Sequence, residues 1–196
     1  GGYLGGRYLS NRNLFVLGMV LQVIGCWLIA TAGVSGLYWG LAMFLTGSGL
    51  NVTCLNMMLT QRFRPEDERR ESAFLWNYAG MNLGFFIGFA VAGYFQLSEN
   101  YRALFLFATF GNLLAIVITL LRWRILKDVN TPLNEASHGR FRLNMLIGVV
   151  ILLLLVPLIR VLLTHAGFSG YFVVTLGVLI FLALGVVTLR HPQRDE

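Results

Sequence analysis

The chain contains few charged residues: Asp, Glu, Lys and Arg make up 12% of its 196 residues. A water-soluble domain typically has about 25% charged residues and about 45–50% apolar ones. Here 57% of the residues are hydrophobic, with the 22 glycines not counted, and the mean hydropathy is +0.70. This composition excludes a soluble globular enzyme, and it also excludes disorder, which requires low hydrophobicity. We therefore expect an integral membrane protein.

Catalytic and metal-binding groups are scarce. Cys26 and Cys54 lie in apolar runs, where small buried packing residues are expected, and no CxxC or Cys/His cluster occurs. His138, His165 and His191 lie in or beside loops, and no Ser/His/Asp set, HExxH motif or Walker loop is present. No carboxylate is expected within an apolar run, although such carboxylates are the usual proton carriers of transporters. The sequence predicts no enzyme, no cofactor, no metal site and no obvious proton-coupling site of its own.

Six apolar segments are long enough to cross a bilayer as helices, which takes about 17–25 residues. Because backbone groups in lipid must bond to one another within the segment, runs of this length form helices, and the alternating pattern of a barrel is absent. The expected fold class is an all-α, polytopic transmembrane protein. The expected spans are Asn13–Ala32, Gly36–Leu59, Ser72–Gln96, Ala103–Leu121, Arg142–Thr164 and Phe168–Leu189.

Lys and Arg are distributed unevenly between the two ends of these segments. Of the 15 basic residues, thirteen lie in or beside residues 1–12, 60–71, 122–141 and 190–196, which share one side of the expected topology. Arg102 alone lies on the other side, and Arg160 lies within a span. By the positive-inside rule, the first side is cytoplasmic. We therefore expect a multi-pass protein of the cell (inner) membrane with cytoplasmic polar loops, and the net charge of +6 requires no nucleic-acid partner.

Amide side chains within the spans need partners, either on another helix or in a water-filled cavity, and the sequence leaves both open. Two clusters favour a cavity, residues 47–51 and 77–84. In the second, Tyr78 and Asn82 are four residues apart and share a helix face. The amides in question are Gln22, Asn51, Asn56, Asn77, Asn82 and Asn112.

Three further features concern helix packing. Gly80, Gly84 and Gly88 form a double GxxxG, for which we expect close packing against a neighbouring helix of the same chain. Pro157 lies inside the fifth segment and should kink it. Arg160 lies near the end of that segment, and its long stem is expected to snorkel toward the membrane surface.

These residues resemble those of a known family. Residues 1–12, followed by a helix with Gly18 and Gly25, are similar to the loop between helices 2 and 3 of major facilitator transporters. More narrowly, the chain resembles the proton-dependent oligopeptide transporter (POT/PTR, peptide transporter) family. That family has a GxG turn in helix 4, followed by an aromatic residue, an acid, an Arg and an F…Y…N-x-G signature in helix 5. The matching residues are Gly47, Gly49, Phe63, Asp67, Arg69, Phe74, Tyr78, Asn82 and Gly84.

The resemblance implies a major facilitator fold of two six-helix bundles around a midplane cavity, of which this chain would be a partial bundle. Residues 1–125 would belong to the N-terminal transporter bundle, from the end of helix 2 to helix 6. Residues 126–141 would be a cytoplasmic linker, and residues 142–196 an additional transmembrane helix pair. Helix 1, whose ExxER motif is central to the family's proton coupling, would lie outside this chain.

The resemblance also implies a substrate site. Tyr78 and Asn82 match positions that line the family's peptide cavity, and we add Asn51 and Val52 to the expected substrate-binding residues. Val52 stands where the family usually has a Lys that helps to coordinate substrate and proton. This departure bears on both peptide specificity and proton coupling.

A cytoplasmic gating loop is expected from two further matches. Gly5 and Arg7 belong to the loop between helices 2 and 3, and Asp67 and Arg69 precede helix 5. Gly6 stands where the family's loop motif has an Asp, which weakens the expected charged latch.

The implied function is secondary active transport of a small organic solute by alternating access, with peptides as the related substrate class and coupling to protons in the full-length protein. The expected partners are this solute, protons and the lipid bilayer. Two alternatives stay open: a non-peptide carrier or exporter of the major facilitator superfamily, for example of siderophore type, and a membrane scaffold that does not transport.

Overall fold

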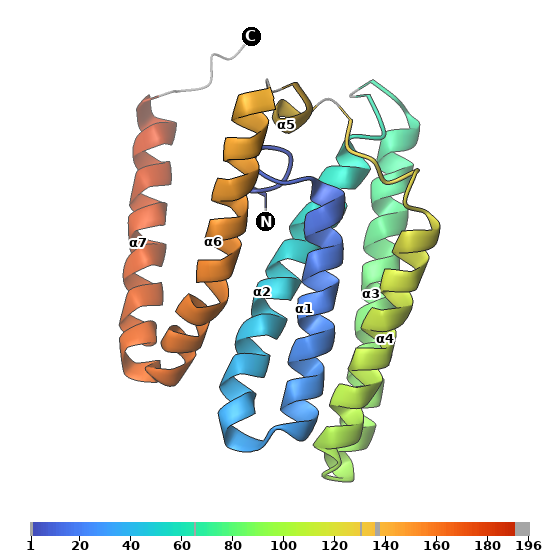
Figure 1. Ribbon diagram of the computed structural model, residues 1–196, viewed down its shortest axis with the longest axis vertical. Helices are drawn as coiled ribbons and strands as arrows, with labels where there is room; N and C mark the ends of the chain where they lie inside the picture. The colour runs from blue at the N-terminus through green and yellow to red at the C-terminus, as the bar shows by residue number, and fades with distance from the viewer. Residues whose placement is uncertain (1, 65, 130, 136–137, 191–196) are drawn as a thin grey trace.

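The computed structural model describes residues 2–64, 66–129, 131–135 and 138–190, and across these residues the chain is built of helices (Figure 1). Outside the described residues lie Gly1, Pro65 before the third expected span, Asn130, Ala136 and Ser137 of the expected linker, and residues 191–196 beyond the last expected span. The helices are α1 (Asn11–Thr31), α2 (Gly33–Thr60), α3 (Arg69–Leu97), α4 (Tyr101–Leu121), the short α5 (Pro132–Glu135), α6 (His138–Thr164) and α7 (Ala166–Arg190).

Six of these helices are long and apolar enough to cross a membrane, which confirms the all-α, six-span prediction. One boundary differs in a way that matters. Helix α3 begins at Arg69 rather than at Ser72, so Glu71 lies in its first turn. The expectation that no carboxylate falls within a span is therefore wrong at this position. An acid is favourable there because the N-terminus of a helix carries partial positive charge.

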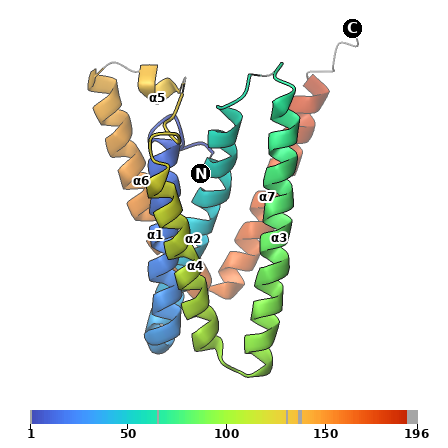
Figure 2. The ribbon, with the colours of Figure 1, turned by 90° about the vertical axis from the view of Figure 1, so that its right-hand side faces the viewer.

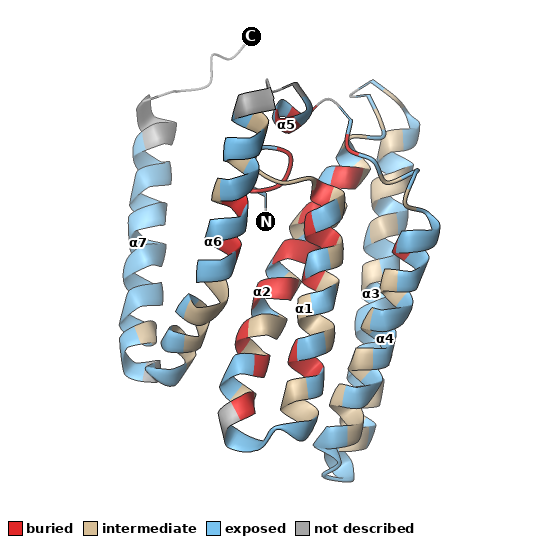
Figure 3. Cartoon of the chain, in the orientation of Figure 1, coloured by how far each residue is buried: buried red, intermediate tan, exposed pale blue. Residues whose placement is uncertain are grey.

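Helices α1 and α2 form the closest helix pair. Gly18 and Gly47 lie against each other, as do Gly25 and Gly40, and a side chain at any of the four would collide with the opposite helix. In membranes, such small residues are what allows two helix backbones to approach. Figure 3 shows buried residues concentrated along this pair.

The buried core follows the same interface toward one end. Cys26 and Cys54 are fully buried, which confirms the packing role predicted for them. Burial of apolar side chains here excludes lipid and water alike and holds α1, α2, α6 and the N-terminal loop together. The core cluster consists of Leu4, Leu14, Phe15, Leu50, Cys54, Met58 and Leu152.

Helix α3 stands apart from the other helices. It joins α4 at the bottom of Figure 2 and diverges from it upward, and none of its described residues is buried. The expectation that Gly80, Gly84 and Gly88 pack against a neighbour within this chain is wrong, because a Cβ at each would meet no atom within 4 Å. The close glycine contacts belong to α1 and α2 instead, where each helix offers a small residue to the other.

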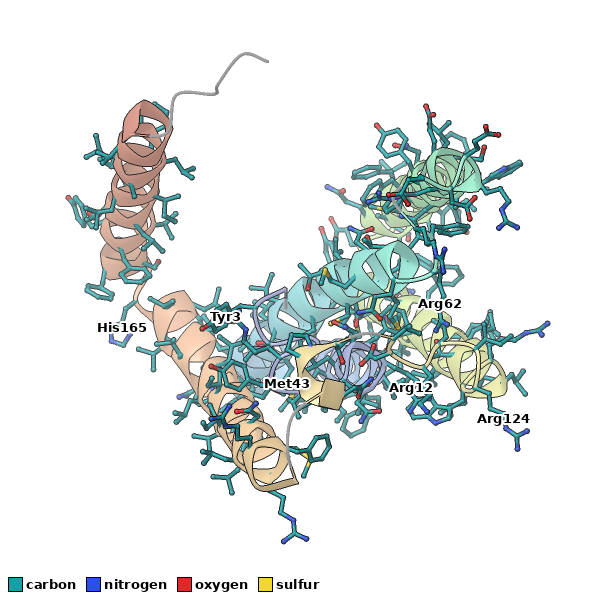
Figure 4. The ribbon with its side chains drawn as sticks, turned by 90° about the horizontal axis from the view of Figure 1, so that it is seen from above. Tyr3, Arg12, Met43, Arg62, Arg124 and His165 are labelled. Atoms are coloured by element: carbon teal, nitrogen blue, oxygen red, sulfur yellow. The ribbon has the colours of Figure 1, made fainter. Side chains whose placement is uncertain are left out.

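Helices α6 and α7 form an antiparallel pair beside this bundle, and the pair meets the bundle where α6 packs on α2 (Figure 1). Figure 1 shows α6 bending in its lower part, and Pro157 is the proline within this helix. A proline removes one backbone hydrogen bond and crowds the preceding turn, which accounts for such a bend. His165 lies in the connection between the two helices (Figure 4).

Polar contacts tie the helices together at the end that carries most of the basic residues, which we call the basic end. The backbone N–H of Asn11 donates to Oδ2 of Asp128 at 2.8 Å. Arg12 donates to the Trp123 carbonyl at 2.8 Å, and its guanidinium stacks 3.8 Å from the centre of the Trp123 ring. Arg62 donates to a backbone carbonyl of the same segment, that of Lys127, at 2.7 Å.

Candidate functional site

A groove of about 590 Å³ lies between α2 and α3, near the basic end. Within it, the amide nitrogen of Asn77 donates to Oδ1 of Asn56 at 3.3 Å, which joins the two helices. The groove combines an amide pair, a phenol, a carboxylate and apolar side chains, so it can hydrogen-bond a polar solute and also contact apolar parts of it. Its lining residues are Asn56, Glu71, Phe74, Leu75, Asn77, Tyr78 and Met81.

Of the four predicted substrate-binding residues, Tyr78 lines this groove, and its side chain is 66% exposed. Asn82 lies one turn further along α3 and is exposed, but its amide nitrogen donates to the backbone carbonyl of Tyr78 at 2.9 Å. Residues four apart on a helix are neighbours, as the sequence predicts.

The other two predicted substrate-binding residues lie on α2 and face different ways. Asn51 is 8% exposed, and its amide nitrogen donates to Oε1 of Gln22 on α1 at 2.7 Å. Here the structure places an amide between helices, and Oδ1 of Asn51 is buried with no described partner. Val52, next along the chain, is 48% exposed. Neither Asn51 nor Val52 is among the described residues that line the groove with Tyr78, and Asn82 is not among them either.

The predicted gating residues form two local arrangements at the basic end. Gly5 is buried in a tight turn in which the backbone N–H groups of residues 8 and 9 donate to the Leu4 carbonyl. Arg7 is exposed, with its guanidinium 4.9 Å from the centre of the Tyr3 ring. Among the described residues, no hydrogen bond or ion pair joins this turn to Asp67 or Arg69.

Asp67 and Arg69 pair with each other in the loop before α3. Arg69 donates through Nε to Oδ1 of Asp67 at 3.1 Å and through Nη2 to Oδ2 at 3.0 Å. These bonds, and one from the Arg69 backbone N–H, hold the pKa of the Asp67 carboxyl below its usual range. The Arg69 side chain is 82% exposed, so solvent screens the pair and it adds little to stability.

Sequence reasoning missed two features of this region. Glu71 falls in the expected loop of residues 60–71, yet its seven-residue spacing from Tyr78 is two helical turns and places both on one face of α3. Asp128 falls in the expected linker of residues 126–141, yet it is 7% exposed and binds the first turn of α1. The Glu71 spacing was readable from the sequence, whereas no local signal marked Asp128, since its partner lies 117 residues away.

The family model of the Major Facilitator Superfamily matches residues 1–190 of this chain. The chain belongs to this superfamily.

Curated relatives of the chain include dipeptide and tripeptide permeases. The chain is 28% identical to the dipeptide and tripeptide permease A of Citrobacter koseri, over 78% of this chain and 31% of that protein. It is 26% identical to the dipeptide and tripeptide permease A of Cronobacter turicensis, over 100% of this chain and 40% of that protein. The chain thus spans less than half the length of these relatives.

Solved structures of peptide transporters also superpose on this chain. A peptide transporter POT in complex with sulfate superposes with a TM-score of 0.74 at 25% identity, covering 98% of this chain and 41% of that one. A POT family transporter in complex with a thioalcohol-conjugated peptide superposes with a TM-score of 0.67 at 24% identity, covering 99% of this chain and 40% of that one, and shows the shared fold. The predicted resemblance to the POT family is confirmed, and the relatives found are transporters rather than enzymes.

Proposed function

We propose that the full-length protein is a secondary transporter of small peptides that works by alternating access, and that this chain supplies part of its N-terminal bundle. The observation that carries the proposal is the groove between α2 and α3. It contains Tyr78, one of the four residues that the resemblance to the peptide transporters predicts to bind substrate, beside the amides of Asn77 and Asn56. The relatives favour this function over a non-peptide carrier and over a scaffold.

The chemistry of the groove suits a short peptide. A peptide carries amide donors and acceptors that can bond to the phenol of Tyr78 and to the Asn77–Asn56 pair. Its side chains vary, and the apolar walls formed by Phe74, Leu75 and Met81 contact them without requiring one chemistry. A groove of this composition favours recognition of the backbone over recognition of one side chain.

Coupling to protons, residence in the inner membrane and a cytoplasmic location of the basic end are parts of this proposal. Glu71 supports the first, since it is the one carboxylate among the residues that line the groove. The uneven distribution of Lys and Arg supports the other two. The gating role of Gly5, Arg7, Asp67 and Arg69 is likewise proposed, on the basis of their position at that end.

The test is uptake of radiolabelled dialanine by the full-length protein in sealed liposomes under an inward proton gradient. We expect uptake that an ionophore abolishes. Tyr78→Phe and Asn77→Ala should each raise KM about three- to tenfold, the scale of one lost hydrogen bond. The matched control is Asn112→Ala, because the amide of Asn112 binds the Ala108 carbonyl of its own helix at 3.0 Å and lies outside the groove.

Each part of the proposal has its own contradicting result. Absence of di- or tripeptide uptake by a protein that is folded contradicts the substrate class. Uptake that persists when the ionophore is present contradicts proton coupling. If Tyr78→Phe and Asn77→Ala behave as Asn112→Ala does, the groove between α2 and α3 is not the peptide site.

A further inference from the structure

An apolar groove of about 570 Å³ runs between α1, α2 and the inner side of α6, separate from the groove described above. It is bounded almost wholly by aliphatic side chains. A second hollow, of about 810 Å³, lies at the end opposite the basic end, and both hollows share Trp39 and Met43 in their linings. Figure 4 shows Met43 where α2 and α6 meet. The two hollows therefore adjoin at Trp39 and Met43, and we treat them together as one groove.

Arg160 lies in the second hollow, and no acid among the described residues pairs with it. Its guanidinium lies over the Trp39 ring, 4.7 Å from the ring centre, and its Nε is buried with no hydrogen-bond partner in the part of the chain that the structure describes. This contact holds the Arg160 side chain against α2. None of the residues lining either hollow is Asp or Glu. A buried guanidinium nitrogen without a partner is costly, so an anion in this hollow would be favourable.

We propose that this groove binds one phospholipid molecule, with the lipid phosphate on Arg160 and an acyl chain along the apolar part. Guanidinium groups bind phosphate oxygens through two parallel N–H donors, which matches the Nε left free here. Phosphatidylglycerol, which carries a net negative charge, should bind more tightly than a zwitterionic phospholipid.

Position along the membrane normal supports a lipid over a soluble anion. Arg160 is four residues from the end of α6, which is about 6 Å along the helix axis and corresponds to headgroup depth. Tryptophan beside it is typical of the membrane interface. The apolar part continues from there toward the bilayer centre, past Val156, Leu153 and Val149, and offers a chain of aliphatic contacts that a free phosphate would leave unused.

The experiment is native mass spectrometry of the full-length protein, released from detergent after titration with phosphatidylglycerol. We expect one retained lipid. Arg160→Gln should weaken retention of the lipid about tenfold. Arg160→Lys should weaken retention less, because the positive charge remains. The matched control is Arg102→Gln, since Arg102 is exposed at the same end on α4 and lies outside both hollows. Leu153→Trp, which fills the apolar part, should also weaken retention.

The remaining outcomes decide against the proposal in distinct ways. If Arg160→Gln retains the lipid as Arg102→Gln does, Arg160 is not the phosphate site. If excess inorganic phosphate displaces the lipid, or if Leu153→Trp retains the lipid as well as the wild-type protein does, the site takes a free anion and not an acyl chain. Wild-type protein that retains no lipid shows that another segment of the protein fills the groove. Circular dichroism of each variant confirms that the helices are intact.

Discussion

The carboxylate of Asp128 accepts a hydrogen bond from the backbone N–H of Asn11, 117 residues earlier in the chain, at 2.8 Å. Both residues are buried. Asn11 is the first residue of α1, and Ser10, which precedes it, makes no capping bond through its side chain. Asp128 therefore serves the start of α1 in place of a local cap, and it attaches the segment after α4 to the N-terminal loop.

We expect Asp128→Asn to destabilise the protein by about 1–2 kcal/mol, because it removes a negative charge from a buried helix N-terminus. The measurement is the thermal unfolding midpoint in detergent. Glu66→Gln serves as the control, since Glu66 is an exposed acid at the same end. Equal midpoints for the two variants would show that Asp128 contributes no more than a loop charge.

The glycine contact between α1 and α2 leads to a second prediction. A Cβ on Gly25 would lie 2.6 Å from the carbonyl oxygen of Gly40, so Gly25→Val should force the helices apart at a cost of about 1–3 kcal/mol. Gly111→Val is the control, because a Cβ there meets no atom within 4 Å. Urea or thermal unfolding in detergent gives the comparison. If Gly25→Val loses no more stability than Gly111→Val does, that result contradicts the close packing of α1 against α2.

Asn82 tests whether the outward face of α3 belongs to the substrate site. Among the described residues, its amide bonds to the carbonyl of Tyr78 in its own helix, so Asn82→Ala should leave the unfolding midpoint nearly unchanged. We expect peptide affinity to fall by about 1–2 kcal/mol, the scale of a lost buried hydrogen bond. Substrate-induced stabilisation measures both quantities in one assay. A lower midpoint with unchanged affinity would assign Asn82 to helix packing.

Val52 tests the link to the peptide transporters' lysine. Because its side chain is 48% exposed, Val52→Lys should be accommodated without displacing a neighbour. The added amine should shift selectivity toward solutes that carry a carboxylate, by about tenfold if a charge-assisted bond forms. Competition of labelled dialanine by a panel of peptides and their C-terminal amides measures the shift. An unchanged ranking would remove Val52 from the substrate site.

The sidedness of the basic end is tested by cysteine labelling in intact cells. Glu66 and Glu99 are both exposed and lie at opposite ends of α3. With a membrane-impermeant maleimide, Glu99→Cys should be labelled and Glu66→Cys should be labelled only after the cells are permeabilised. The native thiols of Cys26 and Cys54 are fully buried and should add little background. Labelling of Glu66→Cys alone would reverse the proposed orientation.

The sequence by itself determined the six spans, the class of fold and the superfamily. These follow from the length of the apolar runs and from local motifs, because in lipid each span satisfies its own backbone hydrogen bonds whatever its neighbours are. The spacing of Tyr78 and Asn82 on α3 was predictable for the same reason, since it depends on the helical repeat alone. The spacing between Glu71 and Tyr78 is equally local, and predicting it requires only that the helix begin before Glu71.

Only the tertiary structure decided which helices meet. GxxxG spacing occurs in α3 at Gly80 and Gly84, yet the close approach in this chain is made by Gly25 and Gly40 of α1 and α2. Spacing identifies a face that permits contact, but a contact also needs a second helix whose own small residues lie at the same depth. Likewise, the hydrogen bond from the Asn11 backbone N–H to Asp128 forms only once α1 and α4 lie side by side. The free energy of a buried hydrogen bond depends on both groups leaving water together.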